Sequence, residues 1–62
     1  MKIGFIGLGN VGGKLANSLI KSRYKLIVRD LDLKLLKKFK KKGAILASSP
    51  KELAENSDII IT

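Results

Sequence analysis

The chain has 62 residues without cysteine or histidine, and 13 Lys and Arg against 5 Asp and Glu give it a net charge of +8. A chain this short forms at most one small domain, which buries only about 60% of its unfolded surface. The missing residue types exclude disulfides and cysteine or histidine metal sites. No apolar run approaches the roughly 20 residues of a membrane-spanning helix, and the start predicts a strand rather than a signal peptide. We therefore expect a protein of the cytosol or of an organelle matrix, cytoplasmic by default, with no membrane partner.

The first half of the chain predicts a strand, a helix and a second strand. Lys2–Ile6 is short, apolar and bounded by glycine, which is typical of a strand buried on both faces. Residues 11–22 predict an amphipathic helix. Lys25–Arg29 is rich in β-formers and ends at Asp30, a residue suited to a turn. The predicted apolar side of the helix consists of Val11, Leu15, Leu19 and Ile20.

Residues 33–42 predict a lysine-rich amphipathic helix that ends at Gly43, which can take a positive φ. Its apolar side is Leu35, Leu36 and Phe39, and its solvated side is Lys34, Lys37, Lys38, Lys40, Lys41 and Lys42. Nucleic acid or an acidic membrane is the alternative partner for so many lysines. One Tyr and two Phe offer few side chains for base stacking, which argues against nucleic acid.

The last part predicts a short strand over residues 44–47, a helix over 50–56 and a strand over 58–62. Ser49 as cap, Pro50 at the first helical position and Glu52 three residues after Ser49 predict a capping box.

The element order is βαβαβαβ. Strands separated by helices pair in parallel through right-handed crossovers, so the fold class is α/β, a partial Rossmann-type doubly wound sheet with strand order 3-2-1-4. The last strand leaves an apolar edge that proteins ordinarily cover. We therefore expect residues 1–62 to be the amino-terminal part of a dinucleotide-binding domain within a longer protein.

The motif with chemical content is G-x-G-x-x-G, formed by Gly7, Leu8, Gly9, Asn10, Val11 and Gly12. It directly follows a predicted strand, opens a predicted helix and is followed by an acid at the end of the second strand. Gly7 permits the tight turn, Gly9 leaves room for the pyrophosphate and Gly12 lets the helix approach the strand. The N–H groups of Leu8, Asn10 and Val11 are expected to face the phosphates, and the Asn10 side chain to cap the helix.

Asp30 is the predicted selectivity residue. Its carboxylate can accept hydrogen bonds from the adenosine ribose and repel a 2′-phosphate, which favours NAD over NADP. Arg29 leaves an alternative open, because it either points away along the strand or reaches a 2′-phosphate and favours NADP.

Residues 3–12, residues 24–30, the Gly43–Ala44 pair and residues 48–50 resemble the β-hydroxyacid dehydrogenases, especially the 3-hydroxyisobutyrate dehydrogenases, and their 6-phosphogluconate dehydrogenase relatives. The resemblance covers all 62 residues. It departs from the family at Val11, usually methionine, and at Arg23, usually glycine. NADP-using relatives typically carry Asn and Arg in place of Asp30 and Leu31, so the resemblance supports NAD.

The resemblance implies an oxidoreductase that transfers hydride between a 3-hydroxy acid and a nicotinamide cofactor. The family's catalytic lysine, substrate loop and helical carboxy-terminal domain lie beyond residue 62. We therefore assign no catalytic residue to this chain, expect it to be inactive alone, and expect a homo-oligomeric parent protein. The alternative is a noncatalytic Rossmann module that binds a dinucleotide or a partner protein.

Overall fold

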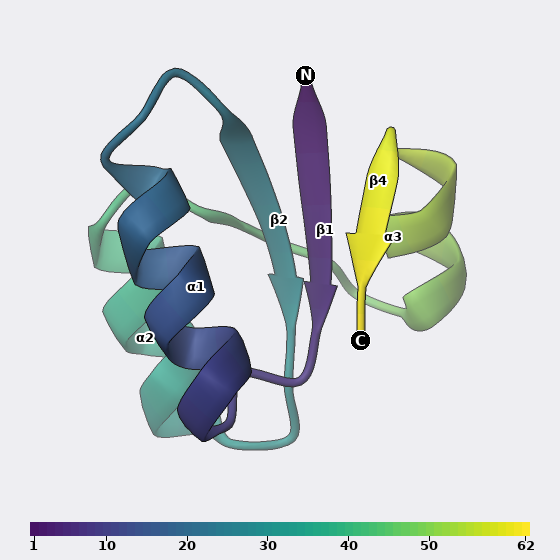
Figure 1. Ribbon diagram of the computed structural model, residues 1–62. Coiled ribbons are helices and arrows are strands. Elements are labelled where there is room, and N and C mark those ends of the chain that lie inside the picture. Colours follow the sequence, from purple (N-terminus) through teal and green to yellow (C-terminus); the bar gives the residue numbers. More distant parts are fainter.

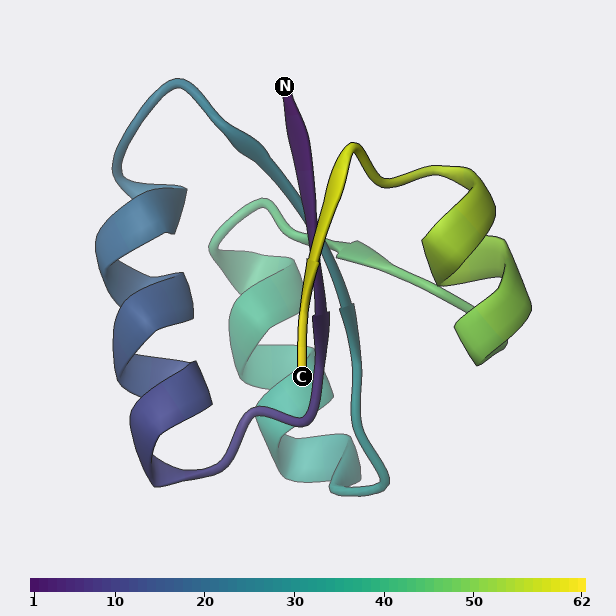
Figure 2. The same cartoon turned by 45° about the vertical axis from the view of Figure 1, so that its right-hand side comes forward.

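The computed structural model describes the backbone of residues 1–62 and every side chain except those of Asn10 and Val11. Four strands form one parallel sheet in the order β3-β2-β1-β4, which confirms the predicted fold class and strand order. The elements are β1 (Lys2–Ile6), α1 (Asn10–Ile20), β2 (Lys25–Arg29), α2 (Leu33–Lys41), β3 (Ile45–Leu46), α3 (Pro50–Glu55) and β4 (Ile59–Ile61). Helices α1 and α2 cover one face of the sheet and α3 covers the other (Figures 1 and 2).

Side-chain alternation along the central strands divides the core between the two faces. Phe5 and Val28 belong to the cluster that packs under α1 and α2, and neither is exposed to solvent. Ile27 lies between Leu26 and Val28 in β2 but belongs to the opposite face, where it packs with Leu53 of α3. Both faces of β1 and β2 are therefore buried, which explains why these two strands are predictable as continuous apolar runs.

Helix α1 uses a different residue at its packing face than the sequence predicts. Ala16 is fully buried, whereas Leu15 is 41% exposed, and Leu19 and Ile20 pack against the core as expected. A small residue at position 16 lets the helix lie close to the sheet. The prediction for Leu15 as a core residue is therefore wrong; the Val11 side chain lies outside the described residues.

A close approach of α3 to β1 depends on Gly4, to which the sequence analysis assigned no role. A Cβ atom at this position would lie 2.3 Å from Ser57 Oγ and 2.5 Å from Leu53 Cδ2. Because Leu53 is fully buried, it has little room to move aside. Gly4 thus allows α3 to pack directly against β1 on this face of the sheet.

The helix ends are specified by local hydrogen bonds. Asp32 caps α2 by accepting hydrogen bonds from the N–H groups of Lys34 and Leu35, and Gly43 follows the helix with a φ of +101°. The N–H groups of Gly43 and Ala44 donate to the Lys40 and Phe39 carbonyls, which is the Schellman arrangement.

Half of the predicted capping box at α3 is confirmed. Ser49 Oγ accepts a 3.0 Å hydrogen bond from the Glu52 N–H, but the Glu52 carboxylate accepts from the N–H and Oγ of Ser48 instead of the Ser49 N–H. Ser48 offers two donors to one carboxylate, which makes this the better partner.

Candidate dinucleotide site

The glycine loop turns sharply at the carboxyl end of β1. Gly7 has a φ of +91°, a conformation that only glycine adopts without strain. A Cβ atom at Gly12 would lie 2.8 Å from the Gly7 carbonyl oxygen, so this glycine lets α1 start directly against the loop. Both glycines therefore have the structural roles that the motif predicts.

Gly9 differs from these two glycines because neither a positive φ nor a close contact requires a glycine there. Its φ is −66°, which any residue can adopt, and an added Cβ would meet no atom of the described residues within 4 Å, its chain neighbours aside. Gly9 occupies the N-cap position of α1, so the predicted cap at Asn10 is wrong by one residue, and the Asn10 side chain itself lies outside the described residues. The open space lies at the positive end of the helix dipole, where an anion is stabilised.

The Asp30 carboxylate is tied directly to the glycine loop. Asp30 Oδ2 accepts a 2.6 Å hydrogen bond from the Leu8 N–H, and the Gly7 N–H donates to the Arg29 carbonyl at 2.9 Å. The sequence predicts that the Leu8 N–H faces a phosphate, but in the structure this N–H is bonded to Asp30. The Leu8 side chain is buried in the core with 2% exposure. The two bonds join the ends of β1 and β2 into one rigid edge.

The other Asp30 oxygen organises the turn after β2. Oδ1 accepts a 2.8 Å hydrogen bond from the Asp32 N–H, which confirms the predicted turn role. The N–H groups of Asp32 and Leu8 hold the pKa of the Asp30 carboxyl below its ordinary value of 3.8, outweighing a partial desolvation that raises it. A carboxylate has about four acceptor positions, so one on each oxygen remains for a ribose hydroxyl.

Arg29 is turned away from this carboxylate. Its Nη1 donates to the carbonyl oxygens of Ala47 at 3.2 Å and Ser48 at 2.9 Å, immediately after β3. The backbone ladder between β2 and β3 ends at the bond from the Ala47 N–H to the Val28 carbonyl, so the guanidinium extends this pairing with side-chain donors. In this position Arg29 ties the end of β2 to the residues that follow β3.

A cavity of about 410 Å³ opens beside Asp30, within the usual range for small-ligand sites. It is lined by Ile6, Gly7, Arg29, Asp30, Leu31 and Pro50. A second cavity of about 330 Å³ lies between α1 and α2 on the other side of the loop. Only the first contains Asp30, the acid at the end of β2. Residues 2–62 match the family model described as the NAD binding domain of 6-phosphogluconate dehydrogenase.

The chain belongs to this NAD-binding domain family. The domain is accordingly a Rossmann-type module for NAD, as the glycine loop and Asp30 predict. The chain is also 50% identical over 60 residues to the mitochondrial 3-hydroxyisobutyrate dehydrogenases of Rattus norvegicus and Mus musculus, and 45% identical to that of Homo sapiens. Each match covers 97% of this chain and 18% of the relative, so the chain spans about a fifth of their length.

Several residues of the site lie outside the motif. A Cβ at Gly13 would lie 2.9 Å from the Leu8 carbonyl oxygen, so Gly13 supports the loop together with Gly12. Pro50 contributes to the wall of the larger cavity from the start of α3. The sequence offers a signal for Gly13, which is the second of two adjacent glycines. It offers none for Pro50, which lies at the site only because of the order in which the strands pair.

Proposed function

We propose that this chain holds NAD through the loop at Gly7, Leu8, Gly9, Asn10, Val11 and Gly12 together with Asp30. The observation that carries the proposal is the space at Gly9. Gly7, Gly12 and Gly13 are explained by the fold itself, whereas Gly9 lacks a side chain where no protein atom needs the room. A pyrophosphate at the amino end of α1 explains the glycine, because a side chain at this position would occupy the space of the phosphates.

The proposed pose places the adenosine in the cavity beside Asp30. The free acceptor positions of the carboxylate bind the ribose hydroxyls, and its negative charge opposes a 2′-phosphate. Because Arg29 is occupied by the Ala47 and Ser48 carbonyls, it does not supply a phosphate ligand. NAD is therefore the preferred cofactor and NADP the weaker one.

We further propose that the parent protein is an oxidoreductase acting on a 3-hydroxy acid. The relatives named as 3-hydroxyisobutyrate dehydrogenases support this assignment. NAD would supply the hydride acceptor there, and the glycine loop and Asp30 of this chain would hold and orient it. Residues 1–62 are then the amino-terminal part of the dinucleotide-binding domain, and they bind the cofactor without turning over substrate. The cytoplasmic location remains part of this proposal.

The test separates the fold from the site by adding one methyl group. In Gly9→Ala the new methyl meets no protein atom, so we expect the unfolding free energy to stay within about 1 kcal/mol of the wild-type value. Calorimetric titration should show NAD affinity at least tenfold lower, because the methyl occupies the place of the pyrophosphate.

Gly12→Ala is the contrasting variant. Its methyl would lie 2.8 Å from the Gly7 carbonyl oxygen, so it should lower stability as well as binding. If Gly9→Ala is folded and binds NAD like the wild type, the pyrophosphate does not sit at Gly9 and the proposed site is wrong. Wild-type chain that folds but does not bind NAD contradicts the proposed function itself.

A further inference from the structure

The outward side of α2 carries a concentrated positive charge. All six lysines between residues 34 and 42 are exposed, and the same segment contains no acid. Phe39 is buried against the sheet, with Leu35 and Leu36 packed beside it. Three of the lysines, Lys34, Lys37 and Lys41, are spaced three and four residues apart on the side of the helix opposite Phe39. We refer to these three as the lysine stripe.

Lys38 and Lys42 lie nearer to α1 and are not part of the stripe. Lys42 Nζ donates to Asn17 Oδ1 and lies 5.6 Å from the centre of the Phe39 ring. Lys38 lines the cavity between α1 and α2. The stripe thus faces solvent, beyond the groove between the two helices.

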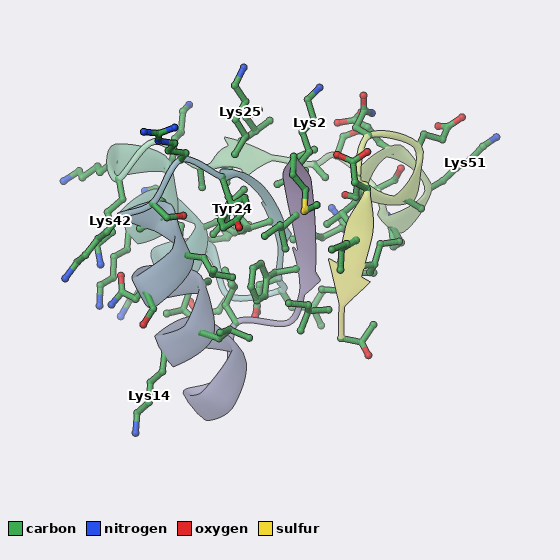
Figure 3. The ribbon with its side chains drawn as sticks, turned by 45° about the horizontal axis from the view of Figure 1, so that its top comes forward. Lys2, Lys14, Tyr24, Lys25, Lys42 and Lys51 are labelled. Atoms are coloured by element: carbon green, nitrogen blue, oxygen red, sulfur yellow. The ribbon has the colours of Figure 1, made fainter. Side chains whose placement is uncertain are left out.

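Acidic side chains of the fold are used elsewhere. Asp30 accepts hydrogen bonds from the Leu8 and Asp32 N–H groups. Asp32 accepts from the Lys34 N–H at the start of α2, and Asp58 accepts from the Lys2 N–H at 2.8 Å. Glu52 binds Ser48 in α3, on the other face of the sheet. Figure 3 shows lysines on both sides of the sheet, with Lys14 and Lys42 projecting on the α1 and α2 side and Lys51 projecting on the α3 side.

Uncompensated lysines at these spacings repel one another, because like charges three or four residues apart destabilise a helix. An anionic surface opposite the stripe removes that repulsion. The shape and charge of this face therefore complement an extended polyanion rather than a small ligand.

The residue types beside the stripe discriminate between lipid and nucleic acid. Leu33, the first residue of α2, is 70% exposed and lies one helical turn before Lys37, and Leu31 is 95% exposed. Exposed leucines next to a basic helix face are typical of proteins that rest in the headgroup region of a membrane. Nucleic-acid surfaces more often combine arginine with accessible aromatic rings, and α2 has no arginine and a buried Phe39.

We propose that the lysine stripe and Leu33 dock this protein on an anionic lipid surface. The contact is peripheral, and no helix in the described part of the chain has the length and hydropathy to cross a bilayer. The proposal revises the sequence-based expectation of no membrane partner, which rested on the short apolar runs and the strand-like start of the chain. Leu31 also lines the dinucleotide cavity, so Leu33 is the leucine to test.

The experiment measures co-sedimentation of the intact chain with phosphatidylcholine vesicles, with and without phosphatidylserine, at physiological ionic strength. Each lysine near an anionic surface strengthens binding about fivefold, so the triple variant Lys34→Gln, Lys37→Gln, Lys41→Gln should lose about 100-fold in affinity. The matched variant Lys2→Gln, Lys25→Gln, Lys51→Gln has the same net charge and alters three exposed lysines outside α2, so it should lose less than about tenfold.

Leu33→Ala tests the apolar part of the contact. We expect binding about fivefold to tenfold weaker, and this loss should persist at high salt because it does not depend on charge. Circular dichroism and urea unfolding establish that each variant is folded.

Three results would overturn the proposal: no binding of wild-type chain to phosphatidylserine vesicles, equal losses in the two triple variants, or stripe-dependent binding to RNA without stripe-dependent binding to vesicles. The second result would mean that net charge alone attracts the chain. None of the substituted residues lines the dinucleotide cavity, so these outcomes are independent of NAD binding.

Discussion

Asp30 links the glycine loop to the turn that starts α2, and this double role separates it from an acid that only contacts a ligand. Each carboxylate oxygen accepts a backbone N–H, from Leu8 on one side and from Asp32 on the other. Replacing the acid therefore disturbs the unliganded loop as well as the cofactor preference.

The lowered pKa of Asp30 leads to a pH prediction. The stabilisation from the ionised carboxylate is complete above 3.8, its ordinary value, and is lost as the pH falls through the lower folded-state pKa. We expect NAD affinity and the urea midpoint to be insensitive to Asp30 between about pH 7 and 5, and to fall below about pH 4.

Asp30→Asn is the control for this profile. The amide offers one acceptor oxygen and an NH2 group, so one of the two backbone donors loses its partner. This variant should bind NAD more weakly at neutral pH, and the difference from wild type should shrink in acid. Glu52, whose pKa is lowered by its hydrogen bonds from Ser48, contributes to acid sensitivity in both proteins. A difference that grows below about pH 4 would contradict the assigned role of Asp30.

Arg29 provides a second prediction at the residue scale. If its guanidinium only fixes the end of β3, Arg29→Met should weaken NAD and NADP binding by the same factor, because the cavity wall at Pro50 loosens for both. A direct phosphate contact would instead produce a loss confined to NADP. Parallel calorimetric titrations with the two cofactors measure this ratio, and Arg23→Met, an exposed arginine before β2, is the matched control.

At the scale of elements, each helix begins with a different device. Helix α1 begins at Gly9, which has no capping side chain, whereas Asp32 and Ser49 cap α2 and α3. Side-chain caps suit α2 and α3, whose starts must be stable without a ligand. In the proposed pose, the N–H groups at the start of α1 face the cofactor.

The cap of α2 can be tested separately from the site. Asp32→Ala removes the acceptor for the Lys34 and Leu35 N–H groups and should lower the unfolding free energy by about 1 kcal/mol. Asp32→Asn retains an acceptor and should lie close to wild type. Urea unfolding followed by circular dichroism measures both. An Asp32→Ala variant as stable as wild type would show that packing of Phe39, not the cap, stabilises α2.

At the scale of the whole molecule, the net charge of +8 on 62 residues destabilises the folded state through repulsion between like charges. Raising the salt from about 0.01 M to 1 M shortens the Debye length from about 30 Å to 3 Å. We expect stability to rise by about 1 kcal/mol, which corresponds to a Tm increase of about 4–8 °C for a domain of this size.

Thermal unfolding at the two salt concentrations checks this expectation. The variant without the lysine stripe should be less sensitive to salt than the variant lacking Lys2, Lys25 and Lys51, because the stripe lysines repel one another at close range. A Tm that falls with added salt would mean that attractive ion pairs dominate the charge balance.

The sequence alone specified the central strands, the parallel order and the glycine loop. These features depend on residues close together in the chain: β1 and β2 are continuous apolar runs, and the motif lies between a strand and a helix. Their prediction needed only local periodicity and the known connection rules, so both strands were placed at their observed ends. The less accurate ends of α1 and α3 are positions where the last residues either continue the helix or leave it at little cost.

Tertiary structure decided what the local pattern could not. Whether Ala16 or Leu15 is buried depends on how closely α1 approaches the sheet, and the need for Gly4 depends on where α3 packs. The partners of Arg29 lie 18 and 19 residues away, and Asp30 meets Leu8 across 22 residues. The sequence shows which residues can accept or donate a hydrogen bond, but a contact between distant residues exists only once the strands have paired.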